Sequence, residues 1–345
     1  MNDCSDSRLA LAHVVAYPDA GLTGRQRCRA WLTNPRRATR PGDARWAATL
    51  ERDLAGTEVA LAESGWRWVA AADPEFPLLL AALVDPPLGL FVRGVLPDRP
   101  AVAVVGARLA SAYGREVADH LGRELAAAGV SVISGMARGV DAAAHRGALA
   151  AGGTTVAVWG AGPDRVYPPE HGPLANEIAV AGGLATEYPP GARPLPHHFP
   201  ERNRLIAGMA RIVVVVEADE KSGALSTARL ALDEGREVMA VPGSIFSRLS
   251  VGPNGLIRAG AAPVLSAGDV LSVLGMSAST QAEEPPPGAL ASVPAGEAFT
   301  IDHLAGLLAQ PVARVLEQVL QWELAGWLTR EPDGRYRRVT SRAHR

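Results

Sequence analysis

The sequence predicts an α/β fold: a doubly wound, mostly parallel sheet, with a small helical domain before it and a compact helix-and-hairpin unit after it. Short, continuous apolar runs recur in the middle of the chain, each followed by a glycine-bearing turn and a helical stretch. Their spacing of roughly 25–30 residues suits strand–helix–strand units. A linker rich in serine, alanine and proline then sets the last part of the chain apart. The apolar runs are Ala101–Val105, Val130–Ile133, Thr154–Trp159, Leu184–Glu187, Ile212–Glu217 and Glu237–Val241.

The composition permits large buried cores. Of the 345 residues, 48% are hydrophobic and 20% are charged, which excludes a mainly disordered chain and suits two or three domains. The 34 basic residues stand against 36 acidic ones, giving a net charge of −2, and Lys221 is the only lysine. This balance excludes a protein held on nucleic acid by its overall field. Any site for a polyanion must be a local cluster of arginines, whose planar forks suit paired contacts with phosphate.

The cysteine content and the absence of long apolar stretches predict a cytoplasmic protein. Cys4 and Cys28 cannot form a disulfide framework, and no Cys/His cluster with metal-ligand spacing surrounds them. The N-terminal residues do not resemble a signal peptide. The longest strongly apolar stretches, such as Ile212–Val216, are too short to cross a bilayer. We therefore expect no membrane association, no metal and no cofactor.

Residues 1–65 form the first predicted domain, which is helical and SAM-like. Its helical stretches are Leu9–Ala16, Gln26–Leu32 and the longer Ala44–Ser64, which Gly65 is placed to end. Residues 66–275 form the second, an extended Rossmann-like domain that opens with a proline-rich lead-in, to residue 100, expected to hold few regular elements. Continuous rather than alternating apolarity in its strands indicates burial on both faces.

Residues 276–298 are the linker, which Pro285–Pro287 make partly semi-rigid. Residues 299–345 follow as a winged-helix-like domain. One helix begins near Ile301 with Thr300 as its cap, and a second runs from Pro311 to about Ala325. Two strands, Trp327–Arg330 and Arg335–Val339, then flank the hairpin turn signal Asp333-Gly334.

Ligands of an open parallel sheet bind beyond the carboxyl ends of its strands, and polar or glycine-rich segments stand at several of those ends here. Gly106-Ala107-Arg108 follows the first strand and opens a helix whose amides could hold an anion. Ser134-Gly135 and Arg138 follow the second strand. Asp141 and His145 lie one helical turn apart after it, either as a general base with its orienting partner or as a structural pair, and the structural interpretation is favoured.

Two further strand ends carry groups suited to a single-stranded nucleic acid. Phe199, Arg202, Asn203 and Arg204 follow the fourth strand, and a ring with guanidinium forks can stack on a base and bind phosphates. The alternative is that Phe199 packs in the core and the arginines form caps or ion pairs. The adjacent His197 and His198 lack the partners of a metal site. Lys221, Ser222 and Gly223 follow the fifth strand as another amide cradle.

Taken together and in order, these motifs resemble the DNA-processing protein A family (DprA, also called Smf), over about residues 74–274. The segments that carry the resemblance are Val104–Arg108, Ser134–Asp141 with Ala144-His145, Phe199–Gly208, Ser222-Gly223 with Thr227-Ala228, Gly235–Val238 and Val241–Gly243.

The resemblance implies a Rossmann-like protein that binds single-stranded DNA during natural transformation. It would load the recombinase RecA past single-strand-binding protein, as a mediator with no catalytic residues. The implied DNA contacts include Phe199 as the stacking ring, and Arg138 and Arg204 could instead brace the pocket from behind. The full set is Arg108, Ser134, Gly135, Arg138, Phe199, Arg202, Asn203, Arg204, Lys221, Ser222 and Gly223. A homodimer is also implied, through Leu256, Ile257 and Val264.

The sequence departs from the family pattern at two positions. Pro196 stands where many members have a lysine, so one phosphate contact is lost or is moved to His197, His198 or Arg193. Ala107 stands in a motif that is commonly Gly-Ser-Arg, which removes a hydroxyl. We expect binding to survive both changes.

Two other functions remain open from the residues. One is a nucleotide-binding enzyme of the phosphoribohydrolase type, although the turn from Ser222 to Thr227 lacks that group's Pro-Gly-Gly-x-Gly-Thr string. The other is a winged helix that reads duplex DNA, or binds a protein, through a basic tail. Its net charge of +4 comes from Glu331 and Asp333 set against Arg330, Arg335, Arg337, Arg338, Arg342 and Arg345.

Overall fold

The computed structural model describes residues 54–276, 290, 293–294, 297–324, 327–331 and 333–338. The expected helices Leu9–Ala16 and Gln26–Leu32 lie outside these residues. The chain divides into two compact units, Met1–Ala278 and Ser279–Arg345. The described part of the first unit opens with helix α4 (Leu54–Glu63), which lies within the helix predicted over Ala44–Ser64. This helix ends before Gly65, whose φ of 74° lies in the left-handed region that favours glycine.

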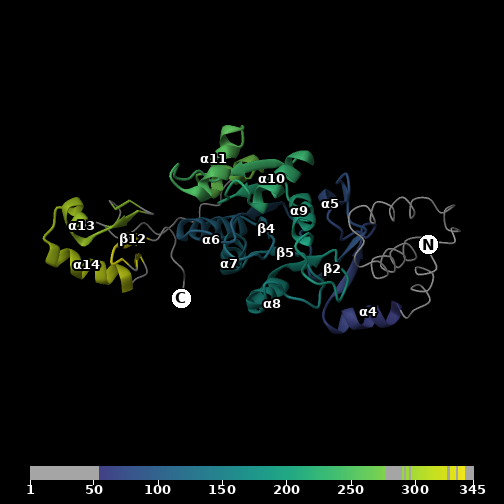
Figure 1. Cartoon of the computed structure of the whole chain (residues 1–345). Helices are drawn as coiled ribbons and strands as arrows, with labels where there is room; N and C mark the ends of the chain where they lie inside the picture. The colour runs from purple at the N-terminus through teal and green to yellow at the C-terminus, as the bar shows by residue number, and fades with distance from the viewer. Residues whose placement is uncertain are drawn as a thin grey trace. The chain divides into compact units, whose positions relative to one another are not determined.

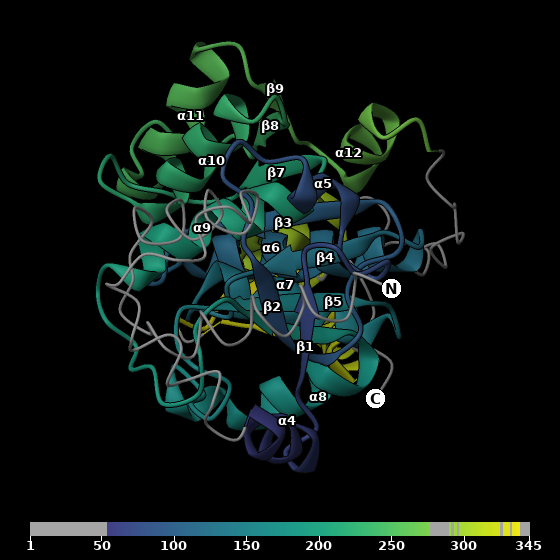
Figure 2. The same cartoon turned by 90° about the vertical axis from the view of Figure 1, so that its right-hand side faces the viewer.

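A sheet of nine strands forms the centre of the first unit, in the order β1-β2-β6-β5-β4-β3-β7-β8-β9 (Figure 2). The seven strands from β6 to β9 in this order are parallel to one another, so the predicted doubly wound, mostly parallel sheet is confirmed. Each of the six predicted strands lies within two residues of its expected bounds. The bounds are β1 Arg67–Ala70, β2 Gly89–Gly94, β3 Ala101–Val105, β4 Ser131–Ser134, β5 Thr155–Trp159, β6 Gly183–Thr186, β7 Ile212–Val215, β8 Glu237–Ala240 and β9 Ala262–Pro263.

The expectation of few regular elements between residues 66 and 100 is wrong. This segment contributes strands β1 and β2, which pair antiparallel with each other, and β2 pairs antiparallel with β6. Prolines surround the strands without entering them, which is why a proline-rich stretch still holds two strands. Leu90, Phe91 and Val92 of β2 are fully buried, so the lead-in is part of the main core.

Helices cover both faces of the sheet because successive side chains of each strand point to opposite faces. In β3, Ala101, Ala103 and Val105 pack toward α5, α9 and α10. Val102 and Val104 face the other way, toward α6, α7 and α12 (Figure 1). The bounds are α5 Leu78–Ala81, α6 Ala112–Ala127, α7 Val140–Ala150, α8 Gly172–Ala181, α9 His198–Met209, α10 Gly223–Asp233, α11 Val251–Arg258 and α12 Ala267–Val273, with short 3-10 turns η2 at Pro169–His171 and η3 at Arg248–Ser250.

The second unit contains two helices and a small antiparallel sheet in the order β10-β12-β11. The Thr300 side chain accepts a hydrogen bond from the His303 amide at 3.2 Å, as expected of a helix cap, and Gly334 takes a φ of 84° in the hairpin turn. Leu290 and Val293 are buried in this unit's core, although both lie in the stretch expected to be linker. The bounds are β10 Ala298–Phe299, α13 Ile301–Leu308, α14 Val312–Leu324, β11 Leu328–Arg330 and β12 Tyr336–Arg338.

Candidate functional site

The strand order changes direction between β3 and β7. From β3 the chain proceeds through β4, β5 and β6 on one side, then crosses to β7, β8 and β9 on the other. The carboxyl ends of all these strands lie at one edge of the sheet, and the crevice where the order changes is where such sheets bind ligands. The segments after β3, β4, β5, β6, β7 and β8 therefore build the candidate site.

An exposed cation and two aromatic rings meet at this edge. The Arg108 guanidinium lies 5.1 Å from the centroid of the Phe199 ring, and the Tyr167 ring centroid lies 5.2 Å from that of Phe199. Arg108 is exposed and Phe199 is half-buried. Gly160, just after β5, lets the Phe199 ring pack closely: a Cβ there would lie 3.1 Å from Cδ1 of the ring. The structure thus brings together Arg108 and Phe199, which the sequence places 91 positions apart.

The end of β7 supplies the neighbouring surface. Lys221 is exposed, and the Ser222 hydroxyl caps α10 by accepting from the Ala224 amide at 3.3 Å. A Cβ added to Gly223 would meet no atom within 4 Å, so the start of α10 is open. The Asn203 side-chain amide donates to the Gly223 carbonyl at 3.3 Å, which joins the start of α10 to α9. Lys221, Ser222, Gly223 and Asn203 therefore lie together.

Arg202 does not reach the surface, contrary to its expected role as a phosphate contact. Its side chain is only 4% exposed, and its Nη1 donates to the carbonyls of Gly135 (2.9 Å) and Val158. Burial lowers the pKa of Arg202 to about 10, against the opposing effect of the Asp141 charge. A Cβ at Gly135 would lie 2.5 Å from this guanidinium, so the glycine makes room for it. Arg202 braces the loop after β4 from below.

Three other expected contacts are also engaged within the protein. The buried Ser134 hydroxyl donates to the Val104 carbonyl at 2.6 Å, between two strands. Arg204 is 9% exposed and donates to both carboxylate oxygens of Glu187, which is 3% exposed. Arg138 is exposed and pairs with Glu170 at 2.5 Å. Of these four side chains, including Arg202, only Arg138 lies at the surface.

An internal carboxylate already occupies the amide cradle at the start of α6. Glu217, 3% exposed, accepts hydrogen bonds from the Ser111 amide at 2.9 Å and from the Ser111 hydroxyl at 2.5 Å. Gly114 makes room for it, since a Cβ there would clash with the carboxylate. A negative charge is stabilised at a helix N-terminus. Glu217 thus takes the Ser111 amide and the Ser111 hydroxyl takes the Gly114 amide, so these two donors are not available to the anion of a ligand.

Asp141 and His145 both have structural partners, in agreement with the favoured interpretation. Asp141 Oδ2 accepts from the amides of Gly135 (3.1 Å) and Ala137 (3.3 Å), which fixes the turn after β4, and burial raises the pKa of this carboxyl. His145 Nδ1 lies 2.7 Å from the Thr155 hydroxyl, which itself donates to the Val132 carbonyl. Nδ1 therefore carries the proton. Burial lowers the pKa of His145 to about 3.

Buried His145 is expected to make the fold sensitive to acid. The unfolded chain binds a proton near pH 6.5 but the native His145 does so only near pH 3, so stability is full above pH 6.5 and is lost as the pH falls between these values. The slope is about 1.4 kcal/mol per pH unit at most. We expect His145→Asn to flatten the dependence of the free energy of unfolding on pH between 6.5 and 4, measured by urea denaturation. The exposed His197→Asn serves as the control, and an equal slope in His145→Asn would contradict the assignment.

Two residues of the site were missed in the sequence. Tyr167 follows β5, and an aromatic residue just beyond the carboxyl end of a strand was the available signal. Glu217 was placed at the end of an apolar run. The available signal was that a carboxylate at the end of a buried strand needs hydrogen-bond donors nearby. Neither residue belongs to a motif whose spacing in the sequence would mark it as part of a site.

The expected dimer contacts differ in exposure. Leu256 and Ile257 of α11 are half-buried, and Leu256 packs against the main core. Val264 is 3% exposed and belongs to the core on the opposite face of the sheet. Its expected role in a dimer contact is therefore wrong, because its side chain is enclosed.

Three of the arginines expected to form a basic surface on the second unit have partners within that unit. Arg335 pairs with Asp333 at 2.7 Å and Arg337 with Glu331 at 2.9 Å, and Arg338 donates to the Leu290 and Val293 carbonyls. Arg342 and Arg345 lie outside the described residues. The exposed face of α14 carries an apolar stripe, Val312, Leu316 and Leu320, with Arg314 as the one cation among the described residues of this helix. A helix reading the major groove presents polar and basic side chains instead.

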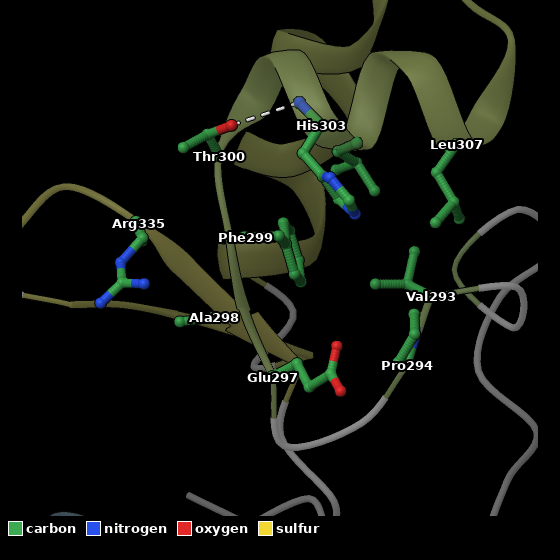
Figure 3. Close-up of a pocket in the computed structure, with 10 residues that line it drawn as sticks. Val293, Pro294, Glu297, Ala298, Phe299, Thr300, His303, Leu307 and Arg335 are labelled. Carbon is green, nitrogen blue, oxygen red and sulfur yellow. Dashed lines mark hydrogen bonds between the residues drawn. The ribbon is translucent and has the colours of Figure 1, made fainter.

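A cavity of about 290 Å³ opens in the second unit between β10, the start of α13 and the Val293-Pro294 segment. Phe299, Val293 and Leu307 give it apolar walls, and the His303 ring points into it (Figure 3). This mixed lining lacks the cluster of cations that a phosphate backbone needs.

Among the described residues, no helix has the length and apolar character to cross a membrane. Within the same part of the chain, no group of three or more His, Cys, Asp or Glu side chains is placed to hold a metal ion.

Comparison with known proteins assigns the chain to a family. A family model described as DNA recombination-mediator protein A matches residues 67–275. Protein Smf of Escherichia coli (strain K12) is 40% identical over 292 residues, which cover 79% of this chain and 78% of that protein. DNA processing protein DprA of Bacillus subtilis (strain 168) is 37% identical over 253 residues, covering 70% of this chain and 85% of the relative.

Two solved structures share the fold. The crystal structure of DNA processing protein A from Streptococcus pneumoniae superposes with a TM-score of 0.64 at 36% identity, covering 75% of this chain and 96% of that one. A structure of DNA processing protein A from Helicobacter pylori, described as giving insights into its single-stranded DNA binding mode, has a TM-score of 0.54 at 29% identity, with 61% and 97% covered. With the family model spanning most of the first unit, the sequence resemblance is confirmed, and the chain belongs to the DNA recombination-mediator protein A family.

Proposed function

We propose that this protein binds single-stranded DNA at the carboxyl edge of its sheet and acts as a recombination mediator in the processing of DNA during natural transformation. The observation that carries the proposal is the exposed cluster of Arg108, Phe199 and Tyr167. Rings of this kind stack on unpaired bases, and a guanidinium beside them binds the neighbouring phosphate. The Helicobacter pylori relative, whose structure is described in terms of single-stranded DNA binding, supports the proposal.

The strand would run from this cluster toward the end of β7. Lys221 and the sterically open N-terminus of α10 offer a cation and the positive end of a helix for the next phosphates. Arg202, Arg204 and Ser134 lie beneath this surface and hold its loops in place. The contacts of the proposed site are therefore the exposed Arg108, Tyr167, Lys221 and Gly223 and the half-buried Phe199, Asn203 and Ser222.

The bound strand would then be handed to RecA in place of single-strand-binding protein. A mediator of this kind needs a binding surface and no catalytic group, which agrees with the structural roles of Asp141 and His145. It would act as a homodimer through the half-buried Leu256 and Ile257 of α11. The direct test is a strand-exchange reaction in which this protein must relieve inhibition by single-strand-binding protein, and failure to do so contradicts RecA loading.

A nucleotide-cleaving enzyme of the phosphoribohydrolase type is not favoured. The turn that would hold its substrate's phosphate, from Ser222 to Thr227 at the start of α10, lacks the Pro-Gly-Gly-x-Gly-Thr string of that group. Release of free base from nucleoside monophosphates would contradict this conclusion.

The binding site is tested by two variants with different salt signatures. Arg108→Ala removes a phosphate contact, so we expect affinity for a dT oligomer to fall about tenfold and the slope of log affinity against log salt to decrease by about 0.7. Phe199→Ala removes stacking, worth about 1–3 kcal/mol per base, and should lower affinity with an unchanged slope. Fluorescence anisotropy measures the affinity and the salt slope. The titrations span about 50 to 300 mM salt, where counterion release changes the affinity strongly.

The matched control for these variants is Arg211→Ala. Arg211 is exposed but precedes β7, at the opposite edge of the sheet, so its removal should change neither affinity nor slope. If Arg108→Ala and Phe199→Ala bind the oligomer as tightly as the unaltered protein does, the site is wrongly placed.

A further inference from the structure

The turn after β8 holds an aromatic ring in solvent. Phe246 is 93% exposed, the most exposed large apolar side chain among the described residues, and its neighbour Ile245 is 83% exposed. Exposed apolar side chains that stand together on an ordered surface mark an interaction site more often than a single scattered one does.

This turn is built to keep its shape. The Ser247 amide donates to the Ser244 carbonyl at 3.0 Å, and the Phe246 amide to the Ser244 hydroxyl at 3.3 Å. Asn254 holds Gly243, the residue before this turn, with two hydrogen bonds. Its side-chain oxygen accepts from the Gly243 amide at 3.2 Å, and its side-chain nitrogen donates to the Gly243 carbonyl at 2.9 Å. The backbone thus fixes Ile245 and Phe246 at the tip, with no core contact to draw them inward.

The turn lies at the same edge of the sheet as the proposed DNA site. β8 is parallel to β7, which is parallel to β3, so their carboxyl ends lie side by side. The Tyr113 hydroxyl of α6, close in sequence to Arg108, donates to the Pro242 carbonyl at 3.1 Å. Arg248, 86% exposed, lies 3.8 Å from Asp219, two residues before Lys221. The loops after β3, β7 and β8 are therefore joined into one surface.

Two basic side chains lie between two aromatic ones along this edge. Phe199 packs on Gly160 at the end of β5, Arg108 follows β3, Lys221 follows β7, and Phe246 follows β8. Four strand spacings separate β5 from β8 in the sheet order, which at about 4.8 Å each is on the order of 20 Å. A single strand several nucleotides long covers that distance, and single-strand sites on another fold, the OB fold, hold about 4–16 nucleotides.

We propose that Phe246 is a second stacking platform for the same single strand, holding a base several nucleotides along from the one on Phe199. Arg248 supplies the phosphate contact beside it, as Arg108 does beside Phe199. This deepens the proposed function and rests on it: the two rings would bind the ends of one segment, and the cations between them would bind its backbone.

Oligomer length separates the two platforms in an experiment. Phe246→Ala is expected to weaken binding of (dT)24 about tenfold, because stacking on Phe246 is lost. It should leave binding of (dT)3, whose two internucleotide steps are too short to reach from one ring to the other, within twofold of the unaltered protein. Phe246→Trp should retain the affinity for (dT)24. The control is Val180→Ala, a change to a side chain that is 89% exposed on α8 and stands three residues before β6, toward the opposite edge. Photocrosslinking of (dT)24 carrying 5-iodouracil, mapped by mass spectrometry, should label the peptide that contains Phe246.

The outcomes distinguish this inference from the proposed function. If Phe199→Ala weakens binding but Phe246→Ala leaves (dT)24 affinity unchanged, or if no crosslink maps to the turn, the second platform is wrong and the first stands. If neither oligomer binds the unaltered protein, the proposed function itself fails. If sedimentation shows that Phe246→Ala separates a dimer and the (dT)24 affinity of the separated chains is restored at high protein concentration, the turn is an interface between copies and the inference is overturned.

Discussion

Replacing Arg204 with methionine is expected to lower the free energy of unfolding by about 3–5 kcal/mol, because it leaves the Glu187 carboxylate buried without its cation. Arg204 is 9% exposed and donates from Nη2 to both oxygens of Glu187, and from Nη1 to the Asp85 carbonyl at 2.8 Å. The ion pair joins α9 to the segment after β6, so its loss loosens the helix that carries Phe199.

Replacing Glu187 as well shows whether the lost free energy of unfolding comes from its carboxylate being left without the Arg204 cation. In the double variant Glu187→Met with Arg204→Met no charge is left buried, so we expect most of the lost stability to return, apart from about 1–3 kcal/mol for the Asp85 carbonyl left without its donor. Urea denaturation of the unaltered protein, both single variants and the double variant measures the coupling. Equal destabilisation in the double variant and in Arg204→Met would contradict the unpaired-charge explanation. The exposed pair of Arg67 and Glu75, 2.6 Å apart, is the matched control, and removing Arg67 should cost at most about 1 kcal/mol.

The central strands could be predicted because burial on both faces leaves a simple pattern. The run Ala101–Val105 is apolar at every position, and in the structure each of its side chains is buried. Strands β1 and β2 were missed for the opposite reason: prolines on both sides dominate the local composition, and the strands owe their existence to pairing with the distant β6. Such pairing depends on tertiary contacts that no local pattern carries.

The site could be predicted at the level of loops but not of side-chain directions. Sequence order places Arg108, Phe199 and Lys221 at the ends of parallel strands, and the structure brings their loops to one edge. The three consecutive residues Arg202, Asn203 and Arg204 could not be told apart, because a helix turns each by about 100° and only the packing decides which face is buried. Asn203 reaches the surface, whereas both arginines are drawn inside by acceptors far away in the sequence: Gly135 and Val158 for one, Glu187 for the other.

The Glu217 carboxylate at the N-terminus of α6 bears directly on where a ligand can bind. A glycine-bearing turn into a helix predicts an anion at the helix N-terminus, and an anion is there, but the protein supplies it. The Glu217 carboxylate accepts from the Ser111 amide at this helix N-terminus, so that amide cannot also bind the phosphate of a ligand. In the proposed function, the single strand therefore binds above the crevice, on the rings of Phe199 and Tyr167 and the cations beside them.

Replacing Arg202 is expected to show whether this residue supports the loop after β4 or binds a phosphate. Arg202→Met would leave the Gly135 and Val158 carbonyls without their donor and the Asp141 carboxylate without a nearby positive charge, so we expect the free energy of unfolding to fall by about 3–5 kcal/mol. Affinity for single-stranded DNA should fall as well, because the loop after β4 loses its support. The slope of log affinity against log salt should stay that of the unaltered protein, since a residue 4% exposed releases no counterion.

Adding Asp141→Asn to Arg202→Met tests the same explanation from the other side. An asparagine oxygen can still accept from the Gly135 and Ala137 amides, but it carries no charge to be left unpaired, so the double variant should regain part of the stability that Arg202→Met loses. Arg108→Ala, measured beside it, should do the reverse and lower the salt slope without changing the denaturation midpoint, because Arg108 is exposed. A salt slope reduced by about 0.7 in Arg202→Met, with its stability unchanged, would mean that Arg202 leaves its buried position to bind phosphate, and the brace would have to be given up.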